Sequence, residues 1–365
     1  MEETLAYIFR DKKGNILTGK NPTFPMVPAS NMKILTGFIS SIVLGENYNI
    51  RTYFKVLNEK LIVSGGPCPL FRTSDAEMIK EKLSVFKIKK VLFRPSLDED
   101  YYAPGWPSSD QKECYQARIT SFSINENCIP ICKSIQNSCK NDPHTGKGIS
   151  DIRPYDTFSR HLVSDVAKDI FRSYEFTNST GGRLIYTHQE RIGDILTHLE
   201  TISCNFSADS LFKFLPSFKT GDRGSWKGGS EVIFQELKRL NLLEQGVQIV
   251  DGSGLSHLNK VTPSMLSNLI RAAIKKDDGT FLQHLPSPGE GTLKNRLKEF
   301  TDYGLKAKTG TLKGVASLSG YIKKLDVTFS IMLNNSTKKE KEAREFIDET
   351  LADNISKIER NLRKF

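Results

Sequence analysis

Three short polar motifs in this sequence combine the residue types needed to transfer an acyl group through a serine. They are Ser30-Asn31-Met32-Lys33, Ser203-Cys204-Asn205 and Lys308-Thr309-Gly310. A serine hydroxyl becomes a nucleophile when a nearby base takes its proton, and a lysine of lowered pKa can be that base. None of these motifs is specific alone, because each type occurs more than once in the chain. The secondary structure predicted around each copy must therefore decide which copies belong to an active site. The repeats are Ser84 to Lys87, Ser109 to Lys112, Ser336 to Lys339, Ser123-Ile124-Asn125 and Lys219-Thr220-Gly221.

The motif at Ser30 is set apart by the helix predicted to follow it. Between Pro28 and Leu44 the apolar residues surround the axis, which predicts a helix buried on all sides. Ser30 lies where this helix would begin, and Lys33 follows one turn later on the same face. A serine there often only caps the helix. Capping does not explain Lys33, since the helix dipole and burial both oppose a cation in the first turn.

A lysine base must be uncharged. A free lysine has a pKa near ~10.4 and is almost fully protonated at neutral pH, and lowering that pKa by about three units takes about 4 kcal/mol. Burial, the positive end of a helix and a second cation all act in this direction. We expect Lys308 to be the second cation beside Lys33.

The second motif falls between two predicted helices, over residues 189–201 and 207–215. Polar side chains of Ser203 and Asn205 could therefore project from a tight junction. The alternative is that Asn205 only caps the second helix. The repeat Ser123-Ile124-Asn125 lies instead in alternating, strand-like sequence, so we favour Ser203 and Asn205 as site residues.

The third motif precedes a predicted strand, turn and strand over residues 312–322 and 327–333. Lys308 would begin an edge strand, where lysine often serves only to block unwanted pairing. Gly310 favours a binding role, because it lets the backbone of a ligand approach and join the strand. The repeat at Lys219 lies in a glycine-rich loop and is typical of a turn.

The order of elements predicts an α+β fold, with an antiparallel β-sheet flanked by helices. Residues 1–50 and 188–365 would form one catalytic domain, and 51–187 an inserted, mostly β domain. The last helix is amphipathic and should pack on the sheet. Its apolar residues are Phe346, Ile347, Leu351, Ile355, Ile358 and Leu362.

Taken together, the motifs resemble those of the low-molecular-mass class C penicillin-binding proteins, which belong to the β-lactamase-like superfamily. These are D-alanyl-D-alanine carboxypeptidases and endopeptidases of peptidoglycan. The resemblance runs nearly end to end and includes Asp251-Gly252-Ser253-Gly254-Leu255-Ser256, which is specific to this family. It also includes Gly65-Gly66, Gly105-Trp106-Pro107, Asn125-Glu126-Asn127, Gly291-Thr292-Leu293 and Arg296.

The resemblance implies a role for each motif. Ser30 would be the nucleophile that penicillins also acylate, Lys33 its general base, and Ser203 with Asn205 a proton relay that also holds the substrate amide. The expected partners are peptides ending in D-Ala-D-Ala and β-lactam antibiotics.

The Lys-Thr-Gly strand would hold the other end of the substrate. Lys308 and Thr309 would bind the terminal carboxylate beside Gly310, and the backbone N–H groups of Ser30 and Thr311 would form the oxyanion hole. Losing one such donor typically costs ~10²–10³ in rate.

Two departures from the family leave other functions open. Gly65-Gly66 is followed by Pro67-Cys68-Pro69 where the family has Asp-Pro, and Arg94 stands where an aspartate is usual. The interval from Ser30 to Ser203 is 173 residues (203 minus 30), so a third nested domain should be missing or reduced. A retired relative that binds wall peptides without turnover, and a β-lactamase or esterase using the same serine, are the alternatives.

Composition gives weaker guidance. The 365 residues are 38% hydrophobic, and no stretch is apolar enough to span a membrane, so a soluble globular protein is expected. The net charge of +10 (52 minus 42) is scattered, which favours a solvated surface over a nucleic-acid site. The resemblance implies an extracytoplasmic protein. The residues that follow Met1 run directly into a strand without a secretory signal, so a cytoplasmic location stays open.

Neither a metal nor a cofactor is expected from the sequence. The six cysteines lack a Cys-x-x-Cys pair, and the six histidines lack ligand spacing. Disulfides are possible outside the cytoplasm, but their pairing stays open. The cysteines are Cys68, Cys114, Cys128, Cys132, Cys139 and Cys204.

Overall fold

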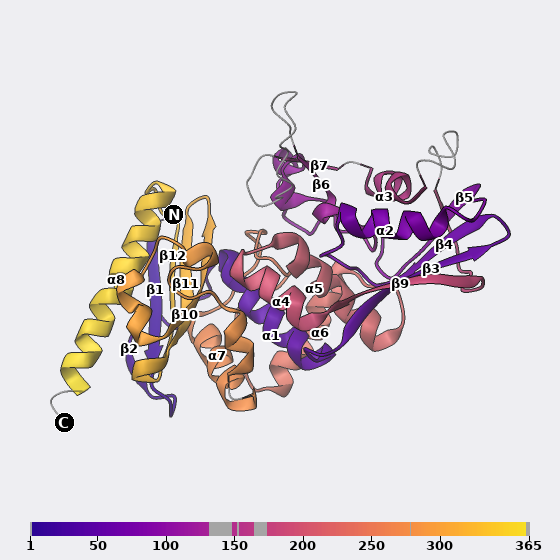
Figure 1. Cartoon of the computed structure of the whole chain (residues 1–365). Coiled ribbons are helices and arrows are strands. Elements are labelled where there is room, and N and C mark those ends of the chain that lie inside the picture. Colours follow the sequence, from indigo (N-terminus) through magenta and orange to yellow (C-terminus); the bar gives the residue numbers. More distant parts are fainter. Residues whose placement is uncertain (1, 131–147, 152, 164–173, 278, 363–365) are drawn as a thin grey trace. The chain divides into compact units, whose positions relative to one another are not determined.

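The computed structural model describes residues 2–130, 148–151, 153–163, 174–277 and 279–362, which form two compact units (Figure 1). The first unit comprises Met1–Ser41, Leu196–Ser203 and Ser230–Phe365, and the second Ile42–Ile195 and Cys204–Gly229. The domain division given above stays a prediction. The units differ from it chiefly in the placement of Cys204–Gly229.

The first unit is built on a five-stranded antiparallel sheet in the order β10-β11-β12-β1-β2. The strands are β1 (Thr4–Arg10), β2 (Ile16–Lys20), β10 (Leu305–Leu312), β11 (Val315–Ile322) and β12 (Val327–Asn334). The predicted strand, turn and strand are confirmed, and β10 is an edge strand as expected. However, β10 begins at Leu305, so Lys308 lies in its middle and not at its start.

Helices cover both faces of this sheet. Alternate residues of a strand point to opposite faces, and β12 shows this clearly. Thr328 faces α7 (Pro263–Asp277), where its hydroxyl meets that of Ser267 at 3.0 Å. Phe329 faces α8 (Glu340–Leu362). The sheet is therefore the middle layer of an α/β/α sandwich (Figure 1).

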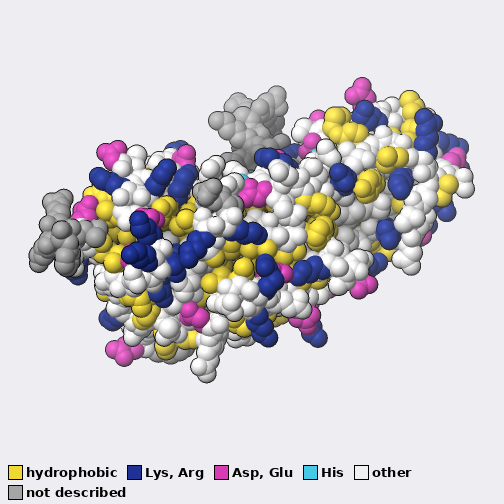
Figure 2. Space-filling model, turned by 90° about the horizontal axis from the view of Figure 1, so that it is seen from below, with side chains coloured by type: hydrophobic (Ala, Val, Ile, Leu, Met, Phe, Trp, Pro, Cys, Tyr) yellow, Lys and Arg dark blue, Asp and Glu magenta, His cyan; other side chains and the backbone are white. Residues whose placement is uncertain are grey.

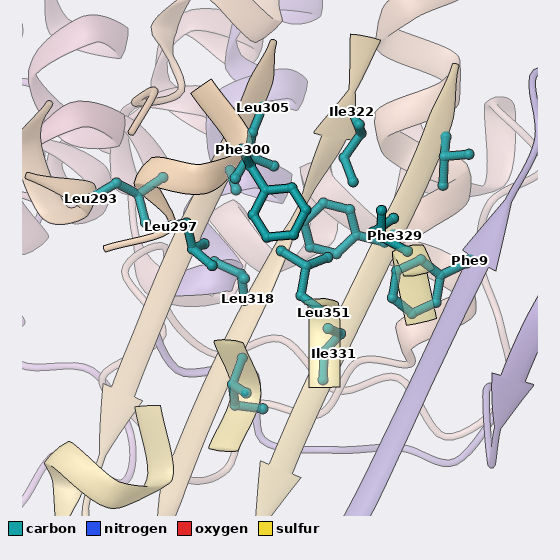
Figure 3. Packing of buried hydrophobic residues seen from close by; sticks show 14 of the residues in the cluster. Phe9, Leu293, Leu297, Phe300, Leu305, Leu318, Ile322, Phe329, Ile331 and Leu351 are labelled. Carbon is teal, nitrogen blue, oxygen red and sulfur yellow. The ribbon is translucent and has the colours of Figure 1, made fainter. Parts of the chain in front are cut away.

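The face under α8 carries an apolar core of the first unit (Figure 3). The rings of Phe9 and Phe329 stack at 5.7 Å between centroids, and Leu351 of α8 packs into the same cluster. Leu351, Ile355 and Ile358 are buried, which confirms the amphipathic helix predicted from the sequence.

The second unit has a five-stranded mixed sheet in the order β8-β5-β4-β3-β9. β3 is antiparallel to both neighbours, while the β4–β5 and β5–β8 pairs are parallel. The strands are β3 (Asn49–Leu57), β4 (Lys60–Gly65), β5 (Lys90–Pro95), β8 (Glu175–Phe176) and β9 (Arg183–Arg191). The strand segments predicted around Phe54, Ile62 and Leu92 are confirmed.

Helices and a short hairpin complete this unit. They are α2 (Thr73–Leu83), α3 (Pro154–Val163), α5 (Asn205–Thr220), β6 (Cys128–Pro130) and β7 (Gly148–Ser150). A disulfide joins Cys114 to Cys128, whereas Cys68 and Cys204 are free, buried thiols. Cys132 and Cys139 lie outside the described residues.

Two local predictions were wrong. The helix expected from residue 189 begins at Ile192 as α4 (Ile192–Thr201), because Glu190 pairs with Ile50 and extends β9. Ser123-Ile124-Asn125 is irregular and not a strand. Asn125 has φ +51°, which a strand does not allow, and its N–H donates to the Phe71 carbonyl at 3.0 Å while its Nδ2 donates to Thr73 Oγ1 at 2.9 Å.

The charged surface agrees with the scattered pattern of the sequence. On the face shown in Figure 2, Lys and Arg side chains lie in small groups with Asp and Glu among them. Within the described ranges, no helix combines the length and apolar character required to cross a membrane.

The packing of α8 gives a stability prediction. Leu351→Ala should lower the free energy of unfolding by about 2–5 kcal/mol, because it removes buried methyl groups and leaves a cavity. Urea denaturation followed by circular dichroism measures this. Lys357→Ala, at an exposed position of the same helix, should change it by less than about 0.5 kcal/mol. Equal effects of the two substitutions would contradict the packing described here.

Candidate active site

The first unit brings Ser30 and Lys33 into direct contact. Ser30 lies in a short 3₁₀ turn, Ala29–Asn31, that leads into α1 (Met32–Leu44). Lys33 Nζ lies 3.1 Å from Ser30 Oγ and donates to the carbonyl of Ser253 at 2.8 Å. Lys33 is fully buried, as are the residues around it in α1, which confirms the buried helix. A lysine in this position can take the proton of the Ser30 hydroxyl only when it is uncharged.

The turn that carries Ser30 is held in an unusual backbone conformation. Ala29 has φ +47°, a left-handed value that is rare for residues other than glycine. Pro28, which has no polar side chain, occupies the cap position of the turn. The alternative that Ser30 only caps the helix is therefore wrong, and its hydroxyl faces Lys33.

The Asp251–Ser256 loop supplies the carbonyl that Lys33 contacts. The Asp251 carboxylate accepts hydrogen bonds from the N–H groups of Gly254 at 2.8 Å and Ser256 at 2.7 Å, which fold the loop around it. This loop aims the Ser253 carbonyl at Lys33. Gly254 has φ +83°, and a Cβ there would lie 1.8 Å from the carbonyl oxygen of Ala29. The loop can therefore support the Ser30 turn only with glycine at this position.

Lys308 contacts the second motif. Its Nζ donates to Ser203 Oγ at 2.8 Å and to the Thr309 carbonyl at 3.1 Å, and its side chain is fully buried. Ser203 follows α4 and has φ +64°. The interpretation of Lys308 as an exposed guard of a strand edge is therefore wrong, although β10 is an edge strand.

β10 lies directly beside the Ser30 turn. A Cβ on Gly310 would be 2.9 Å from both Ser30 N and the Pro28 carbonyl oxygen. Ser317 Oγ of β11 donates to the same Pro28 carbonyl at 2.7 Å. Thr309 is buried and Thr311 is half-buried on this strand. Gly310 thus lets β10 pack closely against the Ser30 turn.

Asn31 fastens the start of α1 to the sheet. With its amide nitrogen toward β10, it donates to the Lys308 carbonyl at 2.7 Å, and its oxygen accepts from Ser319 Oγ at 2.7 Å. This buried bridge fixes the Ser30 turn relative to the strand that carries Lys308.

Asn205 belongs to the second unit, where it begins α5. Its Nδ2 donates to the Tyr115 carbonyl at 2.9 Å. Capping of this helix by Asn205 is wrong, because Cys204 occupies the cap and its Sγ accepts from Ser207 N at 3.4 Å. The predicted residues that the structure brings together in one unit are Ser30, Lys33, Ser203, Lys308, Thr309, Gly310 and Thr311.

Sequence reasoning missed Glu200. Its side chain is fully buried, and neither carboxylate oxygen has a hydrogen-bond donor among the described residues. A Cβ on Gly37, one turn after Lys33, would lie 2.6 Å from Glu200 Oε1, so this glycine makes room for the carboxylate. A signal was present, since Glu200 follows Leu196 by one turn on the apolar face of α4.

The charges of these buried groups depend on one another. Burial and the positive charge of Lys33, opposed by the negative charge of Glu200, together lower the pKa of Lys308 from 10.5 to about 7. Burial raises the pKa of Glu200 to about 7, against the attraction of Lys308 and Lys33. Glu200 therefore partly balances the two buried amines.

The fold is β-lactamase/transpeptidase-like with an extra domain. The chain superposes on penicillin binding protein 4 (dacB) from Haemophilus influenzae with a TM-score of 0.79 at 20% identity, covering 99% of this chain and 96% of that one. It also matches a predatory peptidoglycan endopeptidase from Bdellovibrio bacteriovorus, with a TM-score of 0.60 at 15% identity, covering 98% and 93% of the two chains. At these identities the likeness concerns the fold.

Similarity in sequence to curated proteins is more local. The chain is 33% identical over 153 residues to a D-alanyl-D-alanine carboxypeptidase of Actinomadura sp. (strain R39), an alignment of 39% of this chain and 28% of that protein. It is 31% identical over 125 residues to Carboxypeptidase DacB of Mycolicibacterium smegmatis, covering 31% and 27%. The chain thus spans less than a third of the length of these relatives.

The family itself is settled by a match across most of the sequence. The model of the D-Ala-D-Ala carboxypeptidase 3 (S13) family matches residues 3–169 and 155–354. The chain therefore belongs to this family, which confirms the resemblance seen in the motifs.

The contact between Gly254 and the Ala29 carbonyl can be tested by its effect on stability. Gly254→Ala and Gly289→Ala both place a side chain at positive φ, +83° and +93°, and both should lose about 1–2 kcal/mol for that conformation. Only Gly254→Ala also meets the Ala29 carbonyl, because the space around Gly289 is open. We expect it to lose roughly 1–3 kcal/mol more. Urea denaturation of the two variants measures the difference, and equal losses would argue against the contact.

Proposed function

We propose that this protein is a serine D-alanyl-D-alanine peptidase that acts on peptidoglycan stem peptides through an acyl-enzyme on Ser30. The observation that carries the proposal is the 3.1 Å contact between Lys33 Nζ and Ser30 Oγ in a buried site with a second lysine nearby. Family membership and the names of the relatives agree with this activity.

In the proposed reaction, Ser30 Oγ attacks the carbonyl between the two D-alanines while uncharged Lys33 takes the hydroxyl proton. The new Oγ–C ester bond forms as the C–N bond to the last D-alanine breaks, and the leaving amine receives a proton. Ser203, whose Oγ accepts a hydrogen bond from Lys308 Nζ at 2.8 Å, is the proposed relay for that proton. In the second step Lys33 takes a proton from a water molecule, which attacks the ester. The bond to Ser30 Oγ breaks, and the serine regains its proton.

The environment of Lys33 supports its role as a base. Complete burial disfavours its charge, and a charged Lys308 would disfavour it further. The Ser253 carbonyl accepts one hydrogen from Nζ and so orients the nitrogen toward Ser30.

The opposite side of the site would bind the substrate. Lys308 and Thr309 are proposed to hold the terminal carboxylate, and the backbone N–H groups of Ser30 and Thr311 to stabilise the oxyanion. The absent side chain at Gly310 supports this, since it lets β10, the strand that carries Thr311, lie against Ser30 N. Asn205 is proposed to hold the substrate amide.

A structural neighbour supports penicillin acylation and an extracytoplasmic location. One solved form of the Bdellovibrio bacteriovorus predatory endopeptidase is described as acylated by penicillin G. By extension we propose that penicillins acylate Ser30 here and that the protein works in the cell envelope, where peptidoglycan lies.

Two alternatives have specific motivations. Pro67-Cys68-Pro69 and Arg94 depart from the family, and a retired relative would bind wall peptides without turnover. A β-lactamase or esterase would use the same serine but release penicillin quickly. Release of D-alanine from a pentapeptide excludes the first, and faster turnover of D-alanyl peptides than of nitrocefin excludes the second.

The central test is intact-mass measurement after exposure to penicillin, followed by peptide mapping. The full chain should gain the mass of one penicillin on Ser30, and Ser30→Ala should gain none. Ser109→Ala removes the serine of a repeated Ser-x-x-Lys motif and should label normally. Release of D-alanine should fall by at least ~10³ in Ser30→Ala. Folded protein that stays unlabelled, or an adduct on another residue, would refute the proposal.

The charge balance around Lys308 predicts a pH effect. If a charged Lys308 binds the substrate carboxylate, acylation should weaken as pH rises through the pKa of Lys308 near 7. Glu200→Gln removes the negative charge that raises this pKa, so the loss should occur at lower pH, by about one unit. The pH profile of the penicillin acylation rate measures this.

Glu299→Gln is the matched control for this experiment, because it removes an exposed carboxylate of the same unit. Its profile should follow that of the unsubstituted chain. A Glu200→Gln profile that is unchanged, or displaced to higher pH, would show that Glu200 does not set the charge of Lys308.

A further inference from the structure

A second group of reactive side chains lies in the second unit, on β9 and on the segment that follows β4. Cys68 Sγ, a His188 ring nitrogen and a Glu190 carboxylate oxygen all lie within 4.8 Å of one another. The side chains of His188 and Glu190 are 11% and 5% exposed, and Cys68 is buried. A thiol, an imidazole and a carboxylate are donor types that bind zinc in proteins, and here two of them are buried and the third is nearly so.

The sheet explains why these residues meet. His188 and Glu190 are two residues apart on β9, so they share one face of the sheet. Thr52 of β3 pairs with His188 on one side and with Gly65, the last residue of β4, on the other. The chain after Gly65 folds back over β3, and Cys68 Sγ comes to lie 3.4 Å from Thr52 Oγ1.

Neighbouring groups orient the donors as ligands are oriented in metal sites. Glu190 Oε2 accepts from Leu70 N at 2.9 Å, which leaves Oε1 directed at His188 Nε2, 3.0 Å away. The Phe71 ring packs edge-on against the imidazole at 4.7 Å between centroids. Zinc bonds of 2.0–2.3 Å in tetrahedral geometry place ligand atoms about 3.3–3.7 Å apart. The His188–Glu190 spacing thus needs only a small adjustment.

The charges also suit a dication. A divalent cation binds cysteine as the thiolate, so the Cys68 thiol would release its proton on binding. The thiolate and the carboxylate would then neutralise the cation in a buried setting, where an unbalanced charge is costly.

We propose that Cys68, His188 and Glu190 form a structural zinc site that clamps the segment after β4 onto β9. A thiolate, an imidazole and a carboxylate together favour Zn²⁺ over Mg²⁺ or Ca²⁺. A water molecule would complete the tetrahedron. Cys68 lies in the run where this chain departs from its family, and the proposal is independent of the reaction proposed for Ser30.

Metal analysis of the purified full chain tests this. After extensive dialysis, the protein should retain about one zinc, and the chelator-treated chain should take up one Co²⁺ with a thiolate-to-cobalt charge-transfer band. Zinc should also raise its midpoint of thermal unfolding. A folded chain that binds neither zinc nor cobalt would contradict the proposal. Cys68, His188 and Glu190 would then form a hydrogen-bonded cluster without a metal.

Variants identify the ligands. Cys68→Ser should abolish the charge-transfer band, and Cys68→Ser and His188→Gln should each weaken zinc binding by at least about 100-fold. Cys204→Ser, which removes the other free buried thiol, should keep both properties. Loss of the band in Cys204→Ser alone, or unchanged zinc affinity in folded His188→Gln, would overturn the assignment. If Cys68→Ser fails to fold, His188→Gln and the cobalt spectrum of the unsubstituted chain still decide.

Discussion

The structure of the first unit depends on burying the Lys33 amine against the Ser30 hydroxyl. A charged amine without water is costly, so its neighbours decide whether it serves as a base or as a buried cation. Two of the contacts of Lys33 are the Ser30 hydroxyl and the Ser253 carbonyl, and both tolerate an uncharged nitrogen. The Asp251–Ser256 loop supplies that carbonyl. The loop is held in shape by the Asp251 carboxylate, which accepts hydrogen bonds from the N–H groups of Gly254 and Ser256.

Close backbone approach is the second condition, and glycines meet it. Gly254 lets the loop touch the Ala29 carbonyl, Gly310 lets β10 lie beside Ser30 N, and Gly37 makes room for Glu200. Each position would bring a Cβ within 3 Å of a backbone or carboxylate atom. The site is therefore assembled from backbone contacts as much as from side chains, and the positive φ of Ala29 and Ser203 is part of the same compact arrangement.

Charge is balanced locally in both units. Glu200 opposes two buried lysines in the first, and in the second Glu190 lies beside His188 and the Cys68 thiol. Glu200 lies on α4 and Glu190 on β9, and the sequences of both elements look ordinary. The roles of the two carboxylates follow from the side chains that the fold places beside them. The same physical rule, that a buried charge needs a partner, leads to a catalytic proposal in one unit and a metal proposal in the other.

The sequence by itself determined the elements whose signals are local. The buried helix after Ser30, the strands around Lys308 and the amphipathic helix carrying Leu351 were all predicted, because periodicity and spacing depend on neighbouring residues. Ser30 and Lys33 were paired for the same reason. Only the tertiary structure decided that Ser253 faces Lys33, that Cys114 pairs with Cys128, and that Glu190 extends a strand and not a helix. These contacts join segments far apart in the chain, and no local pattern records which distant segment a side chain will meet.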